Sequence, residues 1–350
     1  MLDNRKNHID EELPDMKSSV SIIVPAHNAR HFLRECLDAV FDQDPAPAEV
    51  IVVDDNSADD TAKIAAEMGA DVLHVSQNAG PSHARNLGAK KAGQQILFFV
   101  DADVVLMPGS VGRVADAFSR QEKLSAIFGS YTAGHRTEGM VSQYRNLLHH
   151  YTHQCGQSEA VTFWSGCGAI RREIFLELGG FDESSFPRCI EDIELGYRLK
   201  MAGGKILLDK KLQGIHLKQW TFWSMVKTDV FCRAIPWTRL ESERPWFQKD
   251  LNIRFSQKTS VVLLGLAFLA ALGMLWDTSL GNLAAVLLIC IMVLNFGLYW
   301  FFLKQQGIKF ALIGIALHLL YFLYSGLGFL YVWICCRLRL PIRDGNLKDF

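Results

Sequence analysis

Apolar and polar positions alternate in blocks along the first hundred residues. Four apolar runs rich in Val, Ile and Phe are predicted strands, at 19–28, 49–57, 71–76 and 95–101. They alternate with predicted helices, at 29–43, 58–68 and 81–93. We expect Ser57 to cap the second of these helices. Continuous apolar strands separated by helices are typical of a parallel sheet covered on both faces, so the pattern predicts an α/β fold with a mostly parallel sheet.

The pattern changes in the last quarter of the chain. Three segments there contain no Asp, Glu, Lys or Arg: 259–276, 280–303 and 310–336. At about 1.5 Å per residue, each reaches roughly the 30 Å of a bilayer core. Three buried helices of a soluble core are the alternative, but such helices usually show a polar stripe. The sequence therefore predicts a C-terminal α-helical transmembrane region, 259–336.

The flanks of these segments indicate how the chain meets the membrane. Residues 218–258 mix Trp and Phe with Lys and Arg, which predicts an interfacial amphipathic region. The loop "DTSLG" has no basic residue and "KQQGIK" has two, which places the N-terminal domain and the second loop in the cytoplasm. The basic tail 337–350 conflicts with a third simple crossing. A break at "YSGLG" (324–328) would return it to the cytoplasm, so the number of crossings stays open.

Composition narrows the setting further. Residues 1–18 are polar and lack the apolar stretch of a signal peptide, so we expect a flexible tail there. The eight cysteines are scattered without a CxxC pair, which favours a reducing compartment. The net charge of −1 gives no global basic field, and we expect no nucleic-acid partner. The localisation expected is an integral membrane protein of the inner or plasma membrane, with a cytoplasmic catalytic domain.

Polar side chains follow the predicted strands where each one ends. They are Asn28 after the first, Asp54 and Asp55 after the second, and Asp101 and Asp103 after the fourth. Ligands bind beyond the carboxyl ends of parallel strands, so these groups should line one crevice. Two carboxylates two residues apart suit Mg²⁺ or Mn²⁺. Taken singly, each group is equally consistent with a helix cap or a solvated turn.

Missing motifs argue against three common classes of nucleotide-binding protein. The chain has no GxxxxGK[ST] sequence, which argues against a P-loop kinase or ATPase. It has no GxGxxG after the first strand, which argues against a dinucleotide-dependent redox enzyme. A nucleotidyltransferase would need a glycine-rich basic loop in the same place, and "PAHNARHF" has no glycine.

A series of motifs carries a specific resemblance. In order they are "IIVPAHNA", "VIVVDDNSADDT", "NAGPSHARNLGAKKA", "FVDADV", "SGCGAIRREIFLELGGFDE" and "CIEDIELGYRLKMAGGKI". The chain resembles a family 2 glycosyltransferase with the GT-A fold, a Rossmann-like α/β fold. The resemblance covers about 200 residues, which sets the expected domain at 19–217.

The resemblance implies a role for each matching position. A nucleotide-sugar site is implied for Pro25, Ala26, Asn28, Asp55, Arg85 and Asp101. The metal, Mg²⁺ or Mn²⁺, is implied at Asp103 as direct ligand, with Asp101 and His216 nearby. The acceptor side is implied at Trp164, Gly166 and Gly168. The catalytic pair is implied at Glu191 and Asp192, with Asp192 as the base. For His216 a surface histidine in a loop is an equally good interpretation.

Two other groups of polar residues receive a structural interpretation. His149 and His153 have the i,i+4 spacing of metal ligands on a helix, but they lack a third ligand, so a solvated or acceptor-facing helix is favoured. Glu194 is two residues beyond Asp192, and on a helix the two side chains do not share a face. We therefore interpret Glu194 as structural.

The resulting hypothesis is an inverting, metal-dependent glycosyltransferase that moves one sugar from a nucleoside-diphosphate sugar. The acceptor would be a hydroxyl or phosphate of a lipid-linked molecule at the cytoplasmic membrane face, in glycan or cell-envelope biosynthesis. One alternative is a non-catalytic nucleotide-sugar-binding scaffold. Another is a processive polysaccharide synthase, which the absence of a QxxRW motif disfavours.

Overall fold

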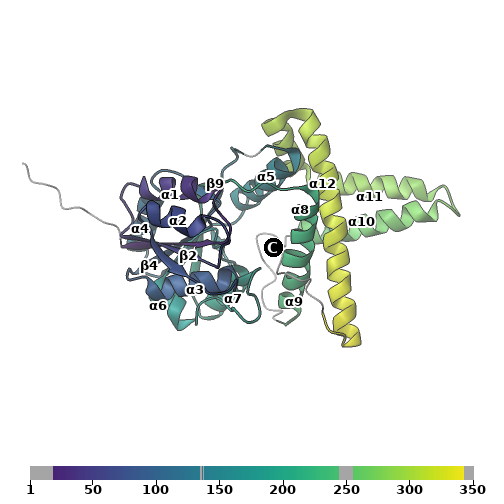
Figure 1. Ribbon diagram of the computed structural model, residues 1–350. Coiled ribbons are helices and arrows are strands. Elements are labelled where there is room, and N and C mark those ends of the chain that lie inside the picture. Colours follow the sequence, from purple (N-terminus) through teal and green to yellow (C-terminus); the bar gives the residue numbers. More distant parts are fainter. Residues whose placement is uncertain (1–18, 135, 137, 244–254, 343–350) are drawn as a thin grey trace, which may run out of the picture.

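The structure is a computed structural model that describes residues 19–134, 136, 138–243 and 255–342. The expected N-terminal tail, 1–18, lies outside the described residues, as do 244–254 of the interfacial region and 343–350 of the basic tail. The strands gather in one half of the molecule and the C-terminal helices form the other half (Figure 1).

The N-terminal half of the sheet confirms the predicted alternation of strands and helices. Its strands are β1 (Val20–Ala26), β2 (Glu49–Asp54), β3 (Asp71–His74) and β4 (Ile96–Val100). They are parallel in the order β3-β2-β1-β4. The helices between them are α1 (Leu33–Phe41), α2 (Thr61–Glu67) and α3 (Pro81–Lys91).

Side chains of the central strands alternate between two apolar clusters, one on each face of the sheet. Ile22 and Phe98 are fully buried in one cluster, and Ile23 and Phe99 in the other. A strand buried on both faces needs apolar side chains at every position, which explains why the predicted strands read as continuous runs.

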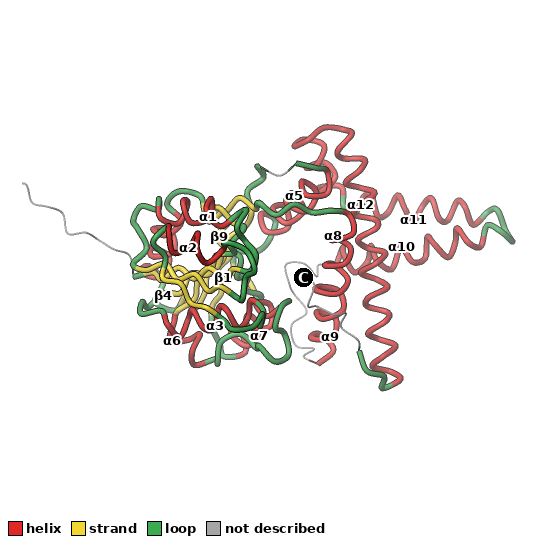
Figure 2. The backbone as a smooth tube through the Cα atoms, in the orientation of Figure 1, coloured by secondary structure: helices red, strands yellow, loops and turns green. Residues whose placement is uncertain are grey.

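The second half of the sheet adds antiparallel strands to the predicted parallel arrangement. It contains β5 (Val104–Leu106), β6 (Leu124–Tyr131), β7 (Glu159–Ala160), β8 (Cys167–Arg171) and β9 (Lys205–His216). β8 inserts between β4 and β6 and is antiparallel to both. β6 and β9 pair in parallel, while β5 and β7 are antiparallel to β9. The whole sheet is therefore mixed. Its strands, yellow in Figure 2, lie together in one half of the molecule.

The remaining helices lie beside this sheet and form the C-terminal half of the molecule. Beside the sheet lie α4 (Ser110–Arg120), α5 (Met140–Gln154), α6 (Arg172–Glu177) and α7 (Glu191–Met201). After β9 come α8 (Phe222–Asp229), a π-helical turn η1 (Val230–Ala234), α9 (Ile235–Glu243), α10 (Phe255–Gly273), α11 (Leu280–Leu294) and α12 (Phe296–Leu338). α10 and α11 form a hairpin that projects from α12 (Figure 1).

The apolar segments break at one place that was not predicted, inside 280–303, and at one that was predicted, inside the loop 304–309. The segment 280–303 is divided at Asn295, where α11 ends and α12 begins. Within α12 the break falls at Gly307, whose φ of 79° is non-helical, because glycine has no Cβ to oppose that conformation. The stretch 324–328 stays helical, and Gly328 lets α12 approach Ala234 closely. The re-entrant break that the sequence left open at this stretch therefore does not occur in α12.

Length and apolarity make two of these helices able to cross a membrane. They are α10 and α12, while the apolar α11 has 15 residues and is shorter. Large apolar side chains such as Leu269, Leu275 and Val293 are exposed on the α10–α11 hairpin. Two such helices are weak support for a membrane region. The predicted span 280–303 is not matched by one helix of spanning length in the described residues, because it is divided between α11 and the beginning of α12.

A buried carboxylate ties the sheet domain to the C-terminal helices. Asp229 of α8 is 1% exposed and pairs with Arg145 of α5 at 3.1 Å and Arg233 of η1 at 2.7 Å. Tyr324 of α12 donates to it at 2.5 Å. Since a buried charge is stable only when paired and hydrogen-bonded, these contacts fix the three helices relative to η1.

Replacing Asp229 with Asn should destabilise the protein strongly. The change leaves Arg145 buried without its counter-charge, and breaking a buried ion pair typically costs about 3–5 kcal/mol. Thermal unfolding of the detergent-solubilised protein measures this. The control is Asp38→Asn, an exposed aspartate of α1. Equal unfolding midpoints for the two variants would contradict the role given to Asp229.

Candidate active site

A cavity of about 1130 Å³ opens where the carboxyl ends of the parallel strands face the C-terminal helices. Its wall on the sheet side includes Asp55, Asp101 and Asp103. Its opposite wall includes Trp237 of α9 and His318 of α12. Of the polar residues predicted to converge from successive strand ends, Asn28, Asp55, Asp101 and Asp103 line this cavity. Asp54 does not line it, and its carboxylate contacts the amide of Ser57 and the ring of His74 instead.

Arg85 of α3 is the positive charge beside the buried carboxylates. It donates to Oδ1 of Asp101 at 2.6 Å through Nη2, and to Oε1 of Glu191 at 2.6 Å through Nη1. Its side chain is 5% exposed, and its guanidinium lies over the ring of Phe181. The arginine therefore connects the end of β4 to the first residue of α7.

One guanidinium cannot neutralise three carboxylates. Asp192 stands beside Glu191, so Asp101, Glu191 and Asp192 surround the single charge of Arg85. Burial raises the pKa of Glu191 to about 7. The positive charge of Arg85 lowers this pKa and the negative charge of Asp192 raises it, but burial has the larger effect. Burial also raises the pKa of Asp192. A carboxylate with a raised pKa accepts a proton more readily, which is what a general base requires.

Asp192 is half-buried at the beginning of α7 and lines the cavity. Its Oδ2 accepts from the Ser165 amide at 3.1 Å and from the Ser165 hydroxyl at 3.3 Å. Its Oδ1 accepts from the amide of Ile193 at 2.8 Å. These bonds hold the carboxylate in one orientation between the β8 loop and the α7 N-terminus.

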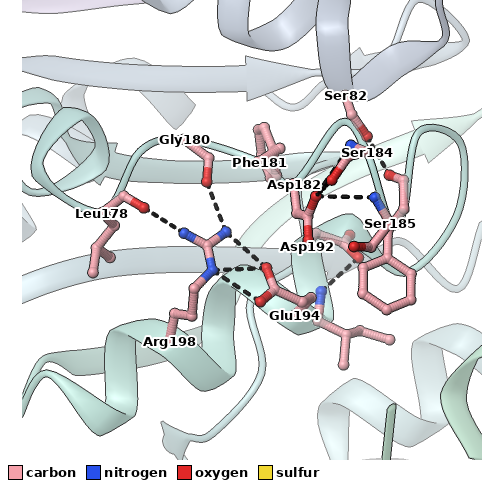
Figure 3. A network of polar contacts seen from close by, with 12 residues as sticks. Ser82, Leu178, Gly180, Phe181, Asp182, Ser184, Ser185, Asp192, Glu194 and Arg198 are labelled. Carbon is pink, nitrogen blue, oxygen red and sulfur yellow. Dashed lines mark hydrogen bonds and ion pairs between the residues drawn. The ribbon is translucent and has the colours of Figure 1, made fainter. Parts of the chain in front are cut away.

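Glu194 points away from the cavity, into a network of its own (Figure 3). Its carboxylate is 1% exposed and accepts two bonds from Nε of Arg198, at 2.9 and 2.8 Å. Arg198 also donates to the carbonyls of Leu178 and Gly180. The network fixes α7 against the preceding loop, so Glu194 has the structural position expected of it.

Asp103 and His216 meet at a second acidic position of the cavity. Nε2 of His216 lies 3.5 Å from Oδ2 of Asp103, and its Nδ1 contacts Oδ1 of Asn146 at 2.9 Å. The imidazole stacks on Tyr131 with centroids 4.4 Å apart. Burial tends to raise the pKa of Asp103, but His216 and then Lys218 lower it overall. His216 is 7% exposed, so it is no surface histidine.

The donors at this position fit a divalent cation with few protein ligands. Asp103 supplies oxygen and His216 nitrogen, a set that suits Mn²⁺ or Mg²⁺ when phosphate oxygens complete the coordination. Asp101, also predicted near the metal, gives one oxygen to Arg85 instead. No group of three or more acidic, His or Cys side chains that could hold a metal ion occurs in the described residues.

The predicted nucleotide side lies along β1 and the loop after β2. Asp55 is 3% exposed and accepts from the amides of Ala79 at 2.8 Å and Gly80 at 2.7 Å. Asn28 has a left-handed backbone, with φ of 49°, and accepts from the amide of Ala58 at 2.8 Å. Pro25, Ala26 and Asn28 line the cavity with Asp55.

The predicted acceptor wall is built around one indole. A Cβ on Gly166 would lie 2.7 Å from the Trp164 ring and 2.9 Å from Oδ2 of Asp101. A Cβ on Gly168 would lie 2.2 Å from the Trp164 carbonyl. Glycine at both positions lets β8 pass between Trp164 and β4, and Trp164 and Gly166 line the cavity. Gly168 does not line it and supports the wall from behind.

Sequence patterns did not identify the contribution of α5. His150 and His153 bond the carbonyls of Tyr131 at 2.7 Å and Gly129 at 2.8 Å, so they anchor α5 to β6. His149 packs between Tyr131 and Trp164. Its i,i+4 partner His153 is engaged with the backbone, in accord with the view that these residues form no metal site. A polar helix with three histidines was the only signal available.

Comparisons with known proteins agree with this geometry. Residues 21–179 match the profile of the family described as "Glycosyl transferase family 2". Residues 21–179, less than half of the chain, are therefore similar to a family 2 glycosyltransferase domain. The GT-A-like fold is supported by a solved mannosyltransferase from Pyrobaculum calidifontis, in complex with GDP-Man and Mn²⁺. It superposes with a TM-score of 0.62 at 16% identity, over 90% of this chain and 87% of that one.

Relatives of the glycosyltransferase domain include enzymes of envelope biosynthesis. A 4,4'-diaponeurosporenoate glycosyltransferase of Staphylococcus haemolyticus is 36% identical over 37% of this chain and 31% of its own. The minor teichoic acid biosynthesis protein GgaA of Bacillus subtilis is 27% identical over 47% of this chain and 40% of its own. The glycosyltransferase GlyA of Streptococcus pneumoniae is 32% identical over 35% of this chain and 18% of its own. The matches therefore span less than half of these relatives.

The raised pKa of Glu191 predicts a pH dependence of stability. Its pKa rises from 4.5 to about 7 on folding, so the folded state holds the proton more tightly. The associated stabilisation is complete below about pH 4.5 and is lost as the pH rises through about 7. Glu191→Gln keeps an oxygen for Arg85 but does not titrate there. The wild type should therefore lose more unfolding free energy than the variant between pH 4.5 and 7.5, in urea denaturation. Parallel pH curves would refute this.

Proposed function

We propose that the protein is an inverting glycosyltransferase that moves one sugar from a nucleoside-diphosphate sugar to an acceptor. The observation that carries this proposal is the pair of separate acidic positions on one cavity. Asp103 with His216 forms one, and Asp192 forms the other, with Arg85 and Asp101 between them. A displacement at a sugar carbon needs both: one group for the leaving diphosphate and another for the proton of the acceptor.

The chemistry follows from these positions. The acceptor oxygen forms a bond to the anomeric carbon while the bond to the diphosphate oxygen breaks, and the diphosphate leaves with the electron pair. Asp192 takes the acceptor proton as the new bond forms. A divalent cation held by Asp103 and His216 would supply charge stabilisation to the departing diphosphate. Asp55, Asn28, Pro25 and Ala26 would hold the nucleoside, and Trp164 the acceptor.

Arg85 would act on this reaction through position and charge. By binding Glu191 and Asp101 at 2.6 Å each, it fixes the start of α7 and therefore the base Asp192. Glu191 is thus a positioning residue in this proposal, because its carboxylate is engaged by Arg85 and 5% of the residue is exposed.

A lipid-linked acceptor is the favoured class. The cavity that contains Asp192 continues to apolar side chains of α10 and α12, including Val262 and Phe329. These helices also carry exposed apolar faces suited to a bilayer. The proposed setting is the cytoplasmic face of the membrane, in cell-envelope biosynthesis, where several relatives of the domain are named.

Asp192→Asn should abolish transfer and leave nucleotide binding with Mn²⁺ nearly unchanged. The amide has nearly the same shape but cannot accept the proton. Asp103→Asn is the matched contrast and should weaken both transfer and metal-dependent binding. Calorimetry with nucleoside diphosphates and a radiolabelled transfer assay separate the two effects. Near-normal turnover by Asp192→Asn would show that another group is the base.

The acceptor class is tested with detergent-solubilised enzyme, labelled sugar nucleotides and Mn²⁺. We expect label to enter the organic phase when membrane lipid extracts are supplied, and to stay water-soluble with the Asp192→Asn variant. Transfer to soluble glycans alone would refute the lipid-linked acceptor and keep the transferase assignment.

A further inference from the structure

Two cations share one indole on the wall of the cavity. The guanidinium carbon of Arg145 lies 5.5 Å from the ring centre of Trp220, and Nζ of Lys218 lies 4.5 Å from it. All three residues line the cavity. Holding two positive charges against one ring is unfavourable in itself, because like charges repel and the aromatic ring offsets little of that repulsion.

The carboxylates nearby do not neutralise this pair. Arg145 shares the single carboxylate of Asp229 with Arg233, so that cluster keeps one net positive charge. Lys218 is exposed, and no carboxylate lies within ion-pair distance of it in the part of the chain that the structure describes. The charge of Lys218 acts on Asp103, the carboxylate already paired with His216. The wall is therefore positive overall.

Trp220 adds a hydrogen-bond donor without an acceptor. Its Nε1 is buried and has no hydrogen-bond partner among the described residues. The backbone of Trp220 is fixed by Ser142 of α5, whose Oγ accepts from the Trp220 amide at 2.8 Å. An unpaired buried donor costs stability unless a ligand completes it. A fixed N–H and two uncompensated cations on one cavity are together the chemistry of an anion site.

We propose that Arg145, Lys218 and Trp220 form a binding station for a phosphate group, beyond the Asp103–His216 pair on the side of the C-terminal helices. The station would hold a doubly charged tetrahedral anion through charge-assisted hydrogen bonds. The phosphate has two sources, the diphosphate of the sugar donor or a phosphate in the headgroup of the acceptor. This inference rests on the proposed function, since it names the chemistry by which that site would recognise a substrate.

The test measures binding of three probes to the full-length protein in detergent. They are a nucleoside diphosphate with Mn²⁺, farnesyl phosphate, and uncharged farnesol as the tail control. Lys218→Gln removes one cation, and Trp220→Phe keeps the ring but removes the N–H donor. Binding of these three probes does not require sugar transfer. A result that contradicts the phosphate station can therefore be distinguished from one that contradicts the glycosyltransferase assignment.

Each variant should raise the dissociation constant of one phosphate-bearing probe about tenfold or more and leave the binding of farnesol unchanged. Loss confined to farnesyl phosphate assigns the station to the acceptor, and loss confined to the nucleoside diphosphate assigns it to the donor. Both results support a phosphate station. The matched control is Lys304→Gln, a lysine 4.9 Å from the ring centre of Trp300, a pair that does not line the cavity.

Arg145 needs a second design because it is also an ion-pair partner of Asp229. Arg145→Lys keeps the charge for Asp229 and loses the planar fork, so it should weaken the phosphate probe while the unfolding midpoint stays near that of the wild type. The proposal is overturned if Lys218→Gln and Trp220→Phe bind both phosphate probes as tightly as Lys304→Gln does.

Discussion

A single buried guanidinium holds the two sides of the cavity together. Arg85 reaches from α3 to the end of β4 and to the first turn of α7, segments that lie far apart in the chain. The acidic groups proposed for the metal and for the proton are next to the two partners of this arginine. Asp103 follows Asp101 by two residues, and Asp192 follows Glu191 directly. The buried arginine keeps its proton at every physiological pH. Its partner Glu191, whose pKa is raised to about 7, takes up a proton as the pH falls below that value.

Local patterns predicted the parts of the fold that local chemistry decides. β1, β2 and β4 were located because strands buried on both faces need apolar side chains at nearly every position. The edge strand β3 is only partly buried, and it was located together with the three helices from the alternation of short apolar runs and helical periods. Ser57 shows the limit of such reasoning, since α2 begins at Thr61 and Ser57 instead bonds the amide of Asn28 through its hydroxyl. The amide of Thr61, at the beginning of α2, donates to Asp59 instead. The sequence alone does not show which of the two residues, Ser57 or Asp59, makes this contact.

The remainder depended on contacts between distant segments. Insertion of β8 between β4 and β6 is decided by tertiary packing, so the mixed sheet could not be derived from the order of strands. The candidate site was found because its acids follow strand ends. The residues around these acids, Asn146, Tyr131 and Trp220, were not found, because they belong to no motif. They come close to Asp103 and His216 only when α5 and the segment after β9 pack in the folded protein.

The packing of α5 determines whether the sheet and the C-terminal helices can be regarded as separate domains. Composition changes near residue 217, yet an apolar cluster joins Tyr144 and Leu147 of α5 to Met225 of α8 and Phe302 of α12. A cut between sheet and helices would pass through packed interior and strip one wall from the cavity. The helical region thus forms part of the cavity wall, and under the proposed function relatives that exchanged it would exchange acceptor preference with it.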